Sequence, residues 1–273
     1  MNAQTWHGHV TTTVLVGCTA LALAVTGTTA TATAQAQAQP RDLGRQTLAA
    51  GDGWASDGTG TTGGAAADAA HVYTVTTWAG FKAALKDGGT APKIIKVKGT
   101  IDANAEGCDS FAAAGYDFDA YLRKYSPENW GYGANLDAEP DDSPEGLRRV
   151  SADTQAKAIK ASVPANTTIV GLGKNAGFEG ASLQITAVDN VIIRNVAFES
   201  PLDCFPQWDP TDTSVGNWNS EYDSAVVYGP RTSGWTTTRS PTGSTPTARC
   251  PPTSGGSTSS TTASWTSSRA RTT

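Results

Sequence analysis

The chain has 273 residues, a net charge of -5 and only 16% charged residues, against roughly 25% in typical globular domains. This low, acidic charge excludes binding to nucleic acid by a basic surface. His7 and His9 lie at the extreme N-terminus, so His71 is the single histidine in the body of the chain. Ser-His-Asp triads and histidine-rich metal sites are therefore excluded as well.

The N-terminal segment, 1–34, has the composition of an export signal. A run of small and apolar residues covers positions 10–25, and an Ala-Thr-Ala site follows at Ala32, which is typical of a signal peptide and its cleavage site. No Lys or Arg precedes the run, which departs from the usual pattern. A membrane anchor, the alternative, needs about 20 apolar residues, whereas this run is shorter and rich in Thr. We therefore expect residues 1–34 to be a secretory signal peptide and the mature protein to be extracellular.

Residues 35–69 are rich in Gln, Gly, Ala and Thr and contain few large apolar side chains, so we expect a flexible leader without a function. A short alternating strand is predicted at residues 71–75. Thr76 or Thr77 can then cap a helix whose apolar residues recur at helical spacing, at Trp78, Phe81 and Leu85. We expect this helix to bury one face and to cap the N-terminal end of the domain.

A second strand is predicted to contain Ile94, Ile95 and Val97 and to end at Gly99. The segment 102–160 follows and is rich in Asp, Glu and Pro, with a helix expected around 156–160. We expect most of this long segment to be a surface excursion.

Export permits disulfides, and the body of the chain holds two cysteines, Cys108 and Cys204. A bridge between them would close a long loop and so restrict the unfolded chain. Two buried free thiols are the alternative, and the sequence leaves this choice open.

From residue 163 onward, short β-branched runs are separated by Gly, Asn and Asp, at residues 167–170, 183–186, 191–196 and 225–228. Such runs are typical of strands without intervening helices. Strands are expected to start at Thr168, Val191 and Ala225, and the second interval is longer than the first because it contains a loop at 201–222. The first interval gives a period in the low twenties, which favours a β-solenoid in which each repeat adds one coil. A sandwich or a barrel could use the same strands.

Two stretches resemble the pectate lyases of the parallel β-helix polysaccharide lyase superfamily: NVIIRNVAFESPLDCFPQWDPTD at residues 190–212 and GNWNSEYDSAVVYG at residues 216–229. Upstream, PKIIKVKGTID at residues 92–102 and VPANTTIVGLG at residues 163–173 are similar to earlier coils of this family. The resemblance covers residues 70–229, which we expect to be the N-terminal part of a pectate lyase domain.

The resemblance implies an all-β fold, a right-handed parallel β-helix (solenoid) that is incomplete at the C-terminus. It also implies secretion, dependence on Ca²⁺, and cleavage of polygalacturonate, the backbone of pectin, by β-elimination. The partner is then a polysaccharide, with no nucleic acid and no membrane contact after signal cleavage, and the chain is expected to be a monomer if it folds.

Glu221 and Asp223 are two residues apart at the start of a predicted strand, so their side chains leave the same face and can converge on one cation. Elimination from a uronate requires the proton beside a carboxylate to become acidic, and a hard cation held by acidic oxygens promotes this. The resemblance makes Asp223 the first candidate calcium ligand and Glu221 the second. Without the resemblance, a solvated pair of charges at a strand edge is the simpler interpretation.

The loop at 201–222 carries further candidates. Three acidic residues either border the expected substrate groove or stabilise the loop: Asp203, Asp209 and Asp212. Two tryptophans could stack on sugar rings, although packing against the scaffold is favoured: Trp208 and Trp218. Two asparagines fit turns between strands, in a structural role: Asn190 and Asn195.

Residues 230–273 depart from the family pattern. They contain 24 Ser or Thr and five Arg, but no acidic residue, Lys, Leu, Ile, Val or Phe, so we expect a disordered, aberrant tail. We interpret it as frameshifted, because a shifted frame permits strings similar to the next family coils; a Ser/Thr-rich linker is the alternative. In the family, more calcium carboxylates and the catalytic arginine lie in later coils. We therefore assign no catalytic residue and expect an inactive fragment.

A second function is compatible with the same sequence, namely a non-catalytic polysaccharide-binding β-solenoid with a Ser/Thr-rich linker. A hydrolase on this scaffold would need paired carboxylates at glycosidase spacing, and Asp209 with Asp212 is a weak signal for such a pair.

Overall fold

A computed structural model describes residues 42–48, 54–56, 60–125, 136–210, 212, 216–229 and 233–236. Arg41–Thr273 forms one compact unit of the chain. The expected signal peptide and the tail beyond residue 236 lie outside the described residues. Within the described ranges, no helix is long and apolar enough to cross a membrane.

Strands dominate the described elements. In chain order they are β1 (Val72–Val75), β2 (Lys93–Asp102), β3 (Lys160–Ser162), β4 (Thr167–Glu179), β5 (Ser182–Thr186), β6 (Val191–Arg194), β7 (Ala197–Glu199), β8 (Gln207–Asp209), β9 (Asn217–Asn219), β10 (Ala225–Tyr228) and β11 (Ser233–Thr236). The α-helices are α1 (Trp78–Lys86), α2 (Phe118–Lys124) and α3 (Pro144–Ile159). Short 3-10 helices lie at Leu43–Arg45, Trp54–Ser56, Ala69–His71, Cys108–Phe111 and Leu136–Ala138. The predicted strands are thus confirmed at β1, β2, β4, β5, β6 and β10.

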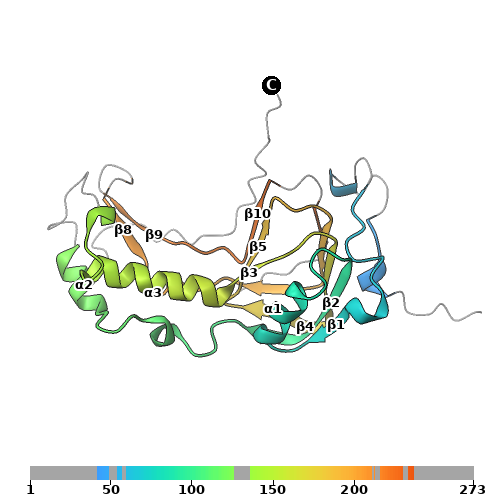
Figure 1. Ribbon diagram of the computed structural model, residues 1–273, viewed down its shortest axis with the longest axis horizontal. Coiled ribbons are helices and arrows are strands. Elements are labelled where there is room, and N and C mark those ends of the chain that lie inside the picture. The colour runs from blue at the N-terminus through green and yellow to red at the C-terminus, as the bar shows by residue number, and fades with distance from the viewer. Residues whose placement is uncertain are drawn as a thin grey trace, which may run out of the picture. The chain divides into compact units, whose positions relative to one another are not determined.

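Two parallel sheets form the body of this unit (Figure 1). The first has the order β1-β2-β4-β6-β11, with β7 also paired to β4, and the second has the order β10-β5-β3. From β3 onward the chain alternates between the sheets, because β3, β5 and β10 belong to one while β4, β6 and β11 belong to the other. Each return to a sheet therefore adds one strand beside the previous one.

Strand pairing defines the repeat. Thr167 of β4 pairs with Val191 of β6, so this passage has nearly the period expected from the sequence. The next passage is longer, because Leu183 pairs with Ala225 and Val191 pairs with Ser233. In the sequence, the longer interval is counted from Val191 to Ala225. These residues lie in different sheets, so that interval is not a repeat of one sheet. Strand β11 also continues the first sheet beyond Gly229, since backbone hydrogen bonding can form a strand from Ser, Gly, Trp and Thr.

Isoleucines from three strands lie at one level of the first sheet. Ile95 pairs with Ile169, which pairs with Ile193, and all three are fully buried. Burial of each such side chain contributes about 1.5–3 kcal/mol. The parallel register therefore brings one apolar residue from each strand into the same core.

Helix α1 forms as predicted. Thr77 is its N-cap, and the Thr77 side chain accepts a hydrogen bond from Gly80 N. The buried face of the helix joins the core of the two sheets through Trp78, Phe81, Ala84 and Leu85. The Phe81 ring lies 4.7 Å from the ring of Phe178 in β4. The cap and the apolar spacing together account for this helix.

Part of the expected leader is tied to the first sheet. Asn190 Oδ1 accepts hydrogen bonds from Thr62 N at 2.7 Å and Gly63 N at 2.8 Å, and its Nδ2 donates to Asn166 Oδ1 at 2.8 Å. A side chain on Gly64 would collide with the backbone carbonyl of Lys93. The small residues that suggested a flexible segment are thus the ones that allow close approach to the sheet.

The segment 102–160 differs from the expected surface excursion, because α3 buries a row of mostly polar side chains. They are Glu145, Arg148, Ser151, Gln155 and Ile159, together with Gly146. Val150 of the same helix is 49% exposed. The sequence predicted a helix only around 156–160, whereas α3 begins at Pro144. Its buried positions are mostly polar, so no apolar period marks the inner face.

Cys108 and Cys204 form a disulfide, with Cα atoms 5.4 Å apart and a sequence separation of 96. This finding decides between the two states that the sequence left open. The bridge ties the 3-10 helix at Cys108–Phe111 to the segment that follows β7.

Replacement of both cysteines, Cys108→Ser with Cys204→Ser, should lower the free energy of unfolding by about 3 kcal/mol, because a long closed loop is released in the unfolded chain. Urea denaturation of the parent and the double variant measures this difference. A reducing agent should shift the midpoint of the parent but not that of the variant. Equal midpoints for the two proteins would contradict the prediction.

Asn190 has a φ of 65°, a conformation that Gly adopts without strain and Ala does not. Asn190→Ala and Asn190→Gly both remove the bonds to Thr62, Gly63 and Asn166. We expect both to destabilise the protein, with Asn190→Ala less stable than Asn190→Gly by about 1 kcal/mol. Thermal unfolding of the pair measures the difference, and equal stability would show that the turn conformation does not matter.

Candidate functional site

The candidate site lies where the chain leaves β7 and returns at β10. Between them, β8 and β9 form an antiparallel hairpin in which Trp208 is paired with Trp218. Trp208 is 4% exposed, and the two indole rings lie 5.4 Å apart. Tyr121 of α2 packs on Trp218 at 6.1 Å, and its hydroxyl accepts a hydrogen bond from Trp208 N. The tryptophans therefore pack the loop against its scaffold, as favoured from the sequence.

A buried ion pair on α3 is hydrogen-bonded to the loop between β7 and β10. Arg148 donates to both carboxylate oxygens of Glu145, at 2.8 and 2.9 Å, and also to the carbonyl oxygen of Phe205 at 2.9 Å. Gln207 Nε2 donates to Glu145 Oε1 at 3.2 Å. Burial opposes the charge of Arg148, but hydrogen bonding to Glu145 keeps its pKa above the usual value. The Glu145–Arg148 pair thus connects α3 to the loop.

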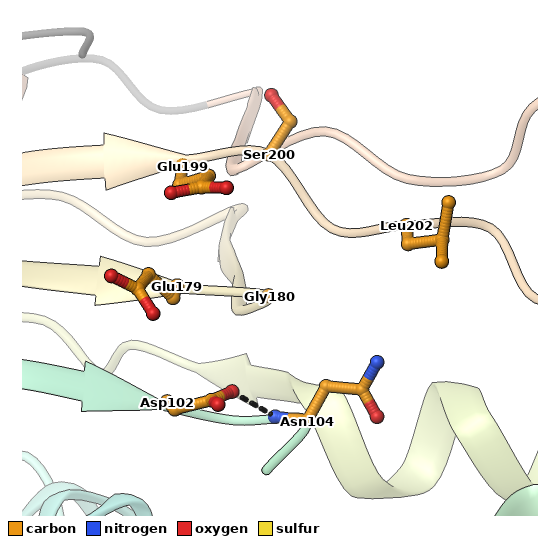
Figure 2. A pocket seen from close by; sticks show the side chains of 7 residues that line it. All are labelled: Asp102, Asn104, Glu179, Gly180, Glu199, Ser200 and Leu202. Atoms are coloured by element: carbon orange, nitrogen blue, oxygen red, sulfur yellow. Dashed lines mark hydrogen bonds between the residues drawn. The ribbon is translucent and has the colours of Figure 1, made fainter. Parts of the chain in front are cut away.

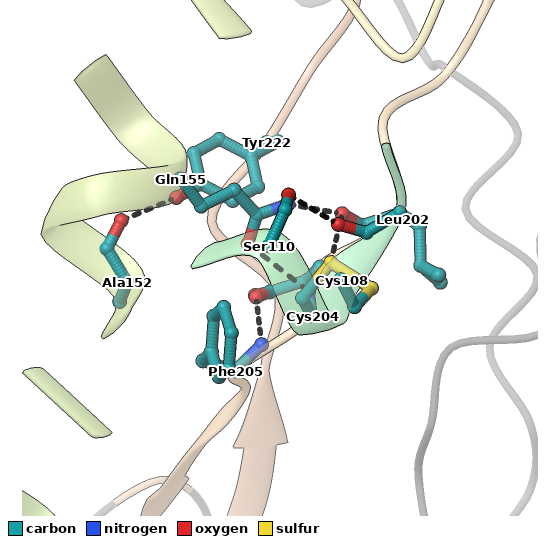
Figure 3. The surroundings of a disulfide bond; sticks show 10 residues. Cys108, Ser110, Ala152, Gln155, Leu202, Cys204, Phe205 and Tyr222 are labelled. Carbon is teal, nitrogen blue, oxygen red and sulfur yellow. Dashed lines mark hydrogen bonds between the residues drawn. A yellow bond between two sulfur atoms is a disulfide. The ribbon is translucent and has the colours of Figure 1, made fainter. Parts of the chain in front are cut away.

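A second set of hydrogen bonds connects α3 to the loop beside the disulfide (Figure 3). Gln155 Nε2 donates to Leu202 O at 2.6 Å, and Cys204 N donates to Gln155 Oε1 at 3.1 Å. Tyr222 Oη donates to Ala152 O at 3.2 Å. Both ends of the loop are therefore bonded to the same helix.

The acidic residues of the loop have separate roles in the fold. Asp203 is 3% exposed, and its carboxylate accepts hydrogen bonds from Phe205 N and Glu221 N. Burial raises the pKa of Asp203 above the usual value of an aspartate. Asp209 accepts from Asp212 N and from the Asn219 amide, both at 3.2 Å, within the hairpin. Loop stabilisation thus accounts for Asp203 and Asp209.

Glu221 and Asp223 lie immediately before β10 rather than inside it. Both are exposed, whereas Tyr222 between them is buried, as expected for extended backbone with alternating sides. Asp223 O accepts a hydrogen bond from Ser182 Oγ at 2.6 Å, which fixes this segment to the second sheet. Lys160 Nζ lies 5.1 Å from the centre of the Tyr222 ring. Across the described residues, no three His, Cys, Asp or Glu side chains are grouped closely enough to hold a metal ion.

An open pocket of about 300 Å³ is lined by the ends of β2, β4 and β7 and by the residues that follow them. Figure 2 shows three carboxylates of the pocket one above another at the ends of neighbouring strands. They occupy one level of the sheet, because Asp102 pairs with Glu179 and Glu179 pairs with Glu199. Ser200, at the rim, is hydrogen-bonded to Ser224 at 3.3 Å and so joins the pocket to the residue after Asp223. Sequence spacing did not reveal this row, since only the strand register brings the three residues together.

The sequence pattern of the pectate lyase family, described as "Pectate lyase", matches residues 24–116 and 132–244. This match is wider than the 70–229 expected and continues past Gly229. A pectate lyase of Bacillus subtilis (strain 168) is 46% identical over 195 residues, covering 69% of this chain and 45% of the relative. Pectate lyase D of Dickeya chrysanthemi is 36% identical over 183 residues, covering 67% of this chain and 35% of the relative.

Solved structures agree with the sequence matches. The thermostable pectate lyase PL 47 is 43% identical with a TM-score of 0.64, and the match covers 70% of this chain and 47% of that one. A pectate lyase bound to a hexasaccharide is 45% identical with a TM-score of 0.62, covering 69% and 48%. The chain thus spans about half the length of these solved relatives.

The Glu145–Arg148 pair can be tested by a double-mutant cycle. Glu145→Leu should lower the free energy of unfolding by about 3–5 kcal/mol, because it leaves the Arg148 charge buried without a partner. Glu145→Leu with Arg148→Met should cost less than Glu145→Leu alone, because both charges are removed. Urea denaturation of the parent, both single variants and the double variant gives the coupling free energy. Additive losses would show that the two charges do not stabilise each other.

Proposed function

This chain belongs to the pectate lyase family, and we propose that it contributes the N-terminal half of a calcium-dependent site that cleaves polygalacturonate, the backbone of pectin, by β-elimination. The observation that carries the proposal is the exposed pair Glu221 and Asp223 just before β10, inside the region matched by the family. The relative bound to a hexasaccharide supports an oligosaccharide as the ligand class.

We further propose that the alternating strands are coils of a right-handed parallel β-helix. The step from Thr167 in β4 to its partner Val191 in β6 and the parallel pairing in both sheets support this arrangement. Helix α1, which packs on the core beside β1 and β2, would be the N-terminal cap. Residues 70–229 then form successive coils of one domain, and β11 begins a further passage.

The proposed calcium ligands are Asp223, with Glu221 second. Ca²⁺ takes six to eight oxygen ligands, so two exposed carboxylates would leave positions for water and for the carboxylates of the substrate. When bound, the cation would offset the negative charge of a uronate and make the proton on the adjacent carbon more acidic. The residues of this chain would hold and orient the cation and the sugar acid. No arginine of the chain matches the family motif for the base, so proton removal is not assigned to a residue here.

We propose an extracellular location, with residues 1–34 acting as the signal peptide. The Cys108–Cys204 disulfide supports this location, because such bonds form and persist in oxidising compartments.

The calcium assignment is tested by titrating the purified chain with Ca²⁺ in a calorimeter. Asp223→Asn should weaken binding at least tenfold, because it removes the charge of the first ligand, and Glu221→Gln should weaken it less. Asp142→Asn is the control for a lost surface charge. Asp142 is exposed and lies just before Ser143, the N-cap of α3. Unchanged affinity in Asp223→Asn would contradict the assignment.

Substrate binding and cleavage are measured separately on the same chain. We expect polygalacturonate to bind only with Ca²⁺ present, and no unsaturated ends to appear in the ultraviolet spectrum, because the family base is unmatched. Calcium-dependent cleavage would contradict the expected inactivity while supporting the calcium site. Binding that persists after chelation of Ca²⁺ would instead support the alternative function, a non-catalytic polysaccharide-binding solenoid.

A further inference from the structure

Asp203 joins the two ends of the loop that precedes the candidate cation site. Its Oδ1 accepts a hydrogen bond from Phe205 N at 3.1 Å, and its Oδ2 accepts one from Glu221 N at 3.0 Å. The second bond connects residues 18 positions apart. One carboxylate thus connects the beginning of the loop with the backbone of a proposed calcium ligand.

The surroundings of Asp203 are held in place by α3 and by the disulfide. Its neighbour Cys204 is bridged to Cys108 and hydrogen-bonded to Gln155. Phe205, two residues further on, is bonded through its carbonyl oxygen to Arg148. Asp203 is therefore fixed on one side, and its bond to Glu221 extends this rigidity to the segment 221–223.

A buried carboxylate is costly unless its oxygens are hydrogen-bonded. Asp203 is 3% exposed and lies near the charges of Arg148 and Glu221. An apolar side chain would remove the cost of burying a charge, but it would leave the Glu221 N–H without this acceptor. Replacement of the Asp203 carboxylate would therefore affect the position of Glu221 as well as the packing around Asp203.

We propose that Asp203 is a positioning residue for the cation site formed by Glu221 and Asp223. This inference rests on the proposed function. Asp203 is assigned no contact with the cation, because its carboxylate is buried and faces the backbone N–H groups of Phe205 and Glu221. Its role is to hold the backbone of Glu221, and through Tyr222 the side chain of Asp223, in the orientation that binds the ion.

The test compares Asp203→Asn with Asp153→Asn. Asp153 is exposed on α3 and acts electrostatically on Tyr222, so its replacement removes a nearby negative charge without removing the bond to Glu221. Terbium, Tb³⁺, serves as a luminescent probe for a Ca²⁺ site and is titrated into each folded variant. Its luminescence lifetimes in H₂O and D₂O report how many water molecules remain on the ion.

We expect Asp203→Asn to weaken terbium binding at least tenfold and to raise the number of bound waters, because a displaced Glu221 no longer ligates. Asp153→Asn should change the affinity less than threefold and leave the hydration unchanged. A folded Asp203→Asn variant with the affinity and hydration of the parent would overturn the inference. If the Asn variant does not fold, Asp203→Glu carries the test with the same expected loss, because one added methylene displaces the backbone of Glu221.

Hydrogen exchange separates this inference from the proposed function. Exchange of the backbone amides at 217–224 should be at least tenfold faster in Asp203→Asn than in the parent, but not in Asp153→Asn. A parent that binds no terbium would overturn the proposed cation site, and the exchange rates then decide alone whether Asp203 orders this segment. Equal exchange in parent and Asp203→Asn would overturn the inference whatever the terbium result.

Discussion

Parallel pairing places residues from distant parts of the chain at the same level of successive strands. In the first sheet the pairing of β2, β4 and β6 aligns Ile95, Ile169 and Ile193 in the core. A shift of one residue would exchange the buried and exposed faces of a strand, so the apolar row fixes the register. After a register shift between Lys98 and Thr100, the pairing of β2, β4 and β7 aligns Asp102, Glu179 and Glu199 near the ends of their strands. Strand pairing, including this shift, thus determines which acidic side chains meet at the edge of the sheet.

The loop between β7 and β10 depends on polar contacts as well as on apolar and aromatic packing. Arg148 and Glu145 bind the backbone of Phe205 and the side chain of Gln207, while Gln155 binds the backbone beside the disulfide. Buried polar groups are costly when unpaired and directional when paired. This directionality gives the loop one defined path to Glu221 and Asp223, which an apolar contact surface would not specify as sharply.

The sequence predicted those parts of the fold whose local pattern matches their burial. Helix α1 followed from Thr77 and the spacing of its apolar residues, and the strands followed from short β-branched runs. Helix α3 was not foreseen as a buried element, because Arg148 and Gln155 face inward while Val150 faces solvent. The attachment of residues 60–64 was missed because small residues suit both a flexible leader and close packing.

For the candidate site, the alternation of Glu221, Tyr222 and Asp223 was visible in the sequence, and their exposure agrees with it. The row of Asp102, Glu179 and Glu199 was not visible, because it exists only through strand pairing. Asp203 was named as a loop residue with two possible roles, and its bond to Glu221 needed the folded path of the loop.

The central claim is that strand register and the loop contacts together place Glu221 and Asp223 where they hold a hard cation. A crystal structure of the purified chain grown with Tb³⁺, with the ion located by anomalous scattering, tests it most directly. We predict an anomalous peak within about 2.3–2.6 Å of the Asp223 carboxylate oxygens. A peak confined to the pocket of Asp102, Glu179 and Glu199, or no ordered ion on the chain, would contradict the claim.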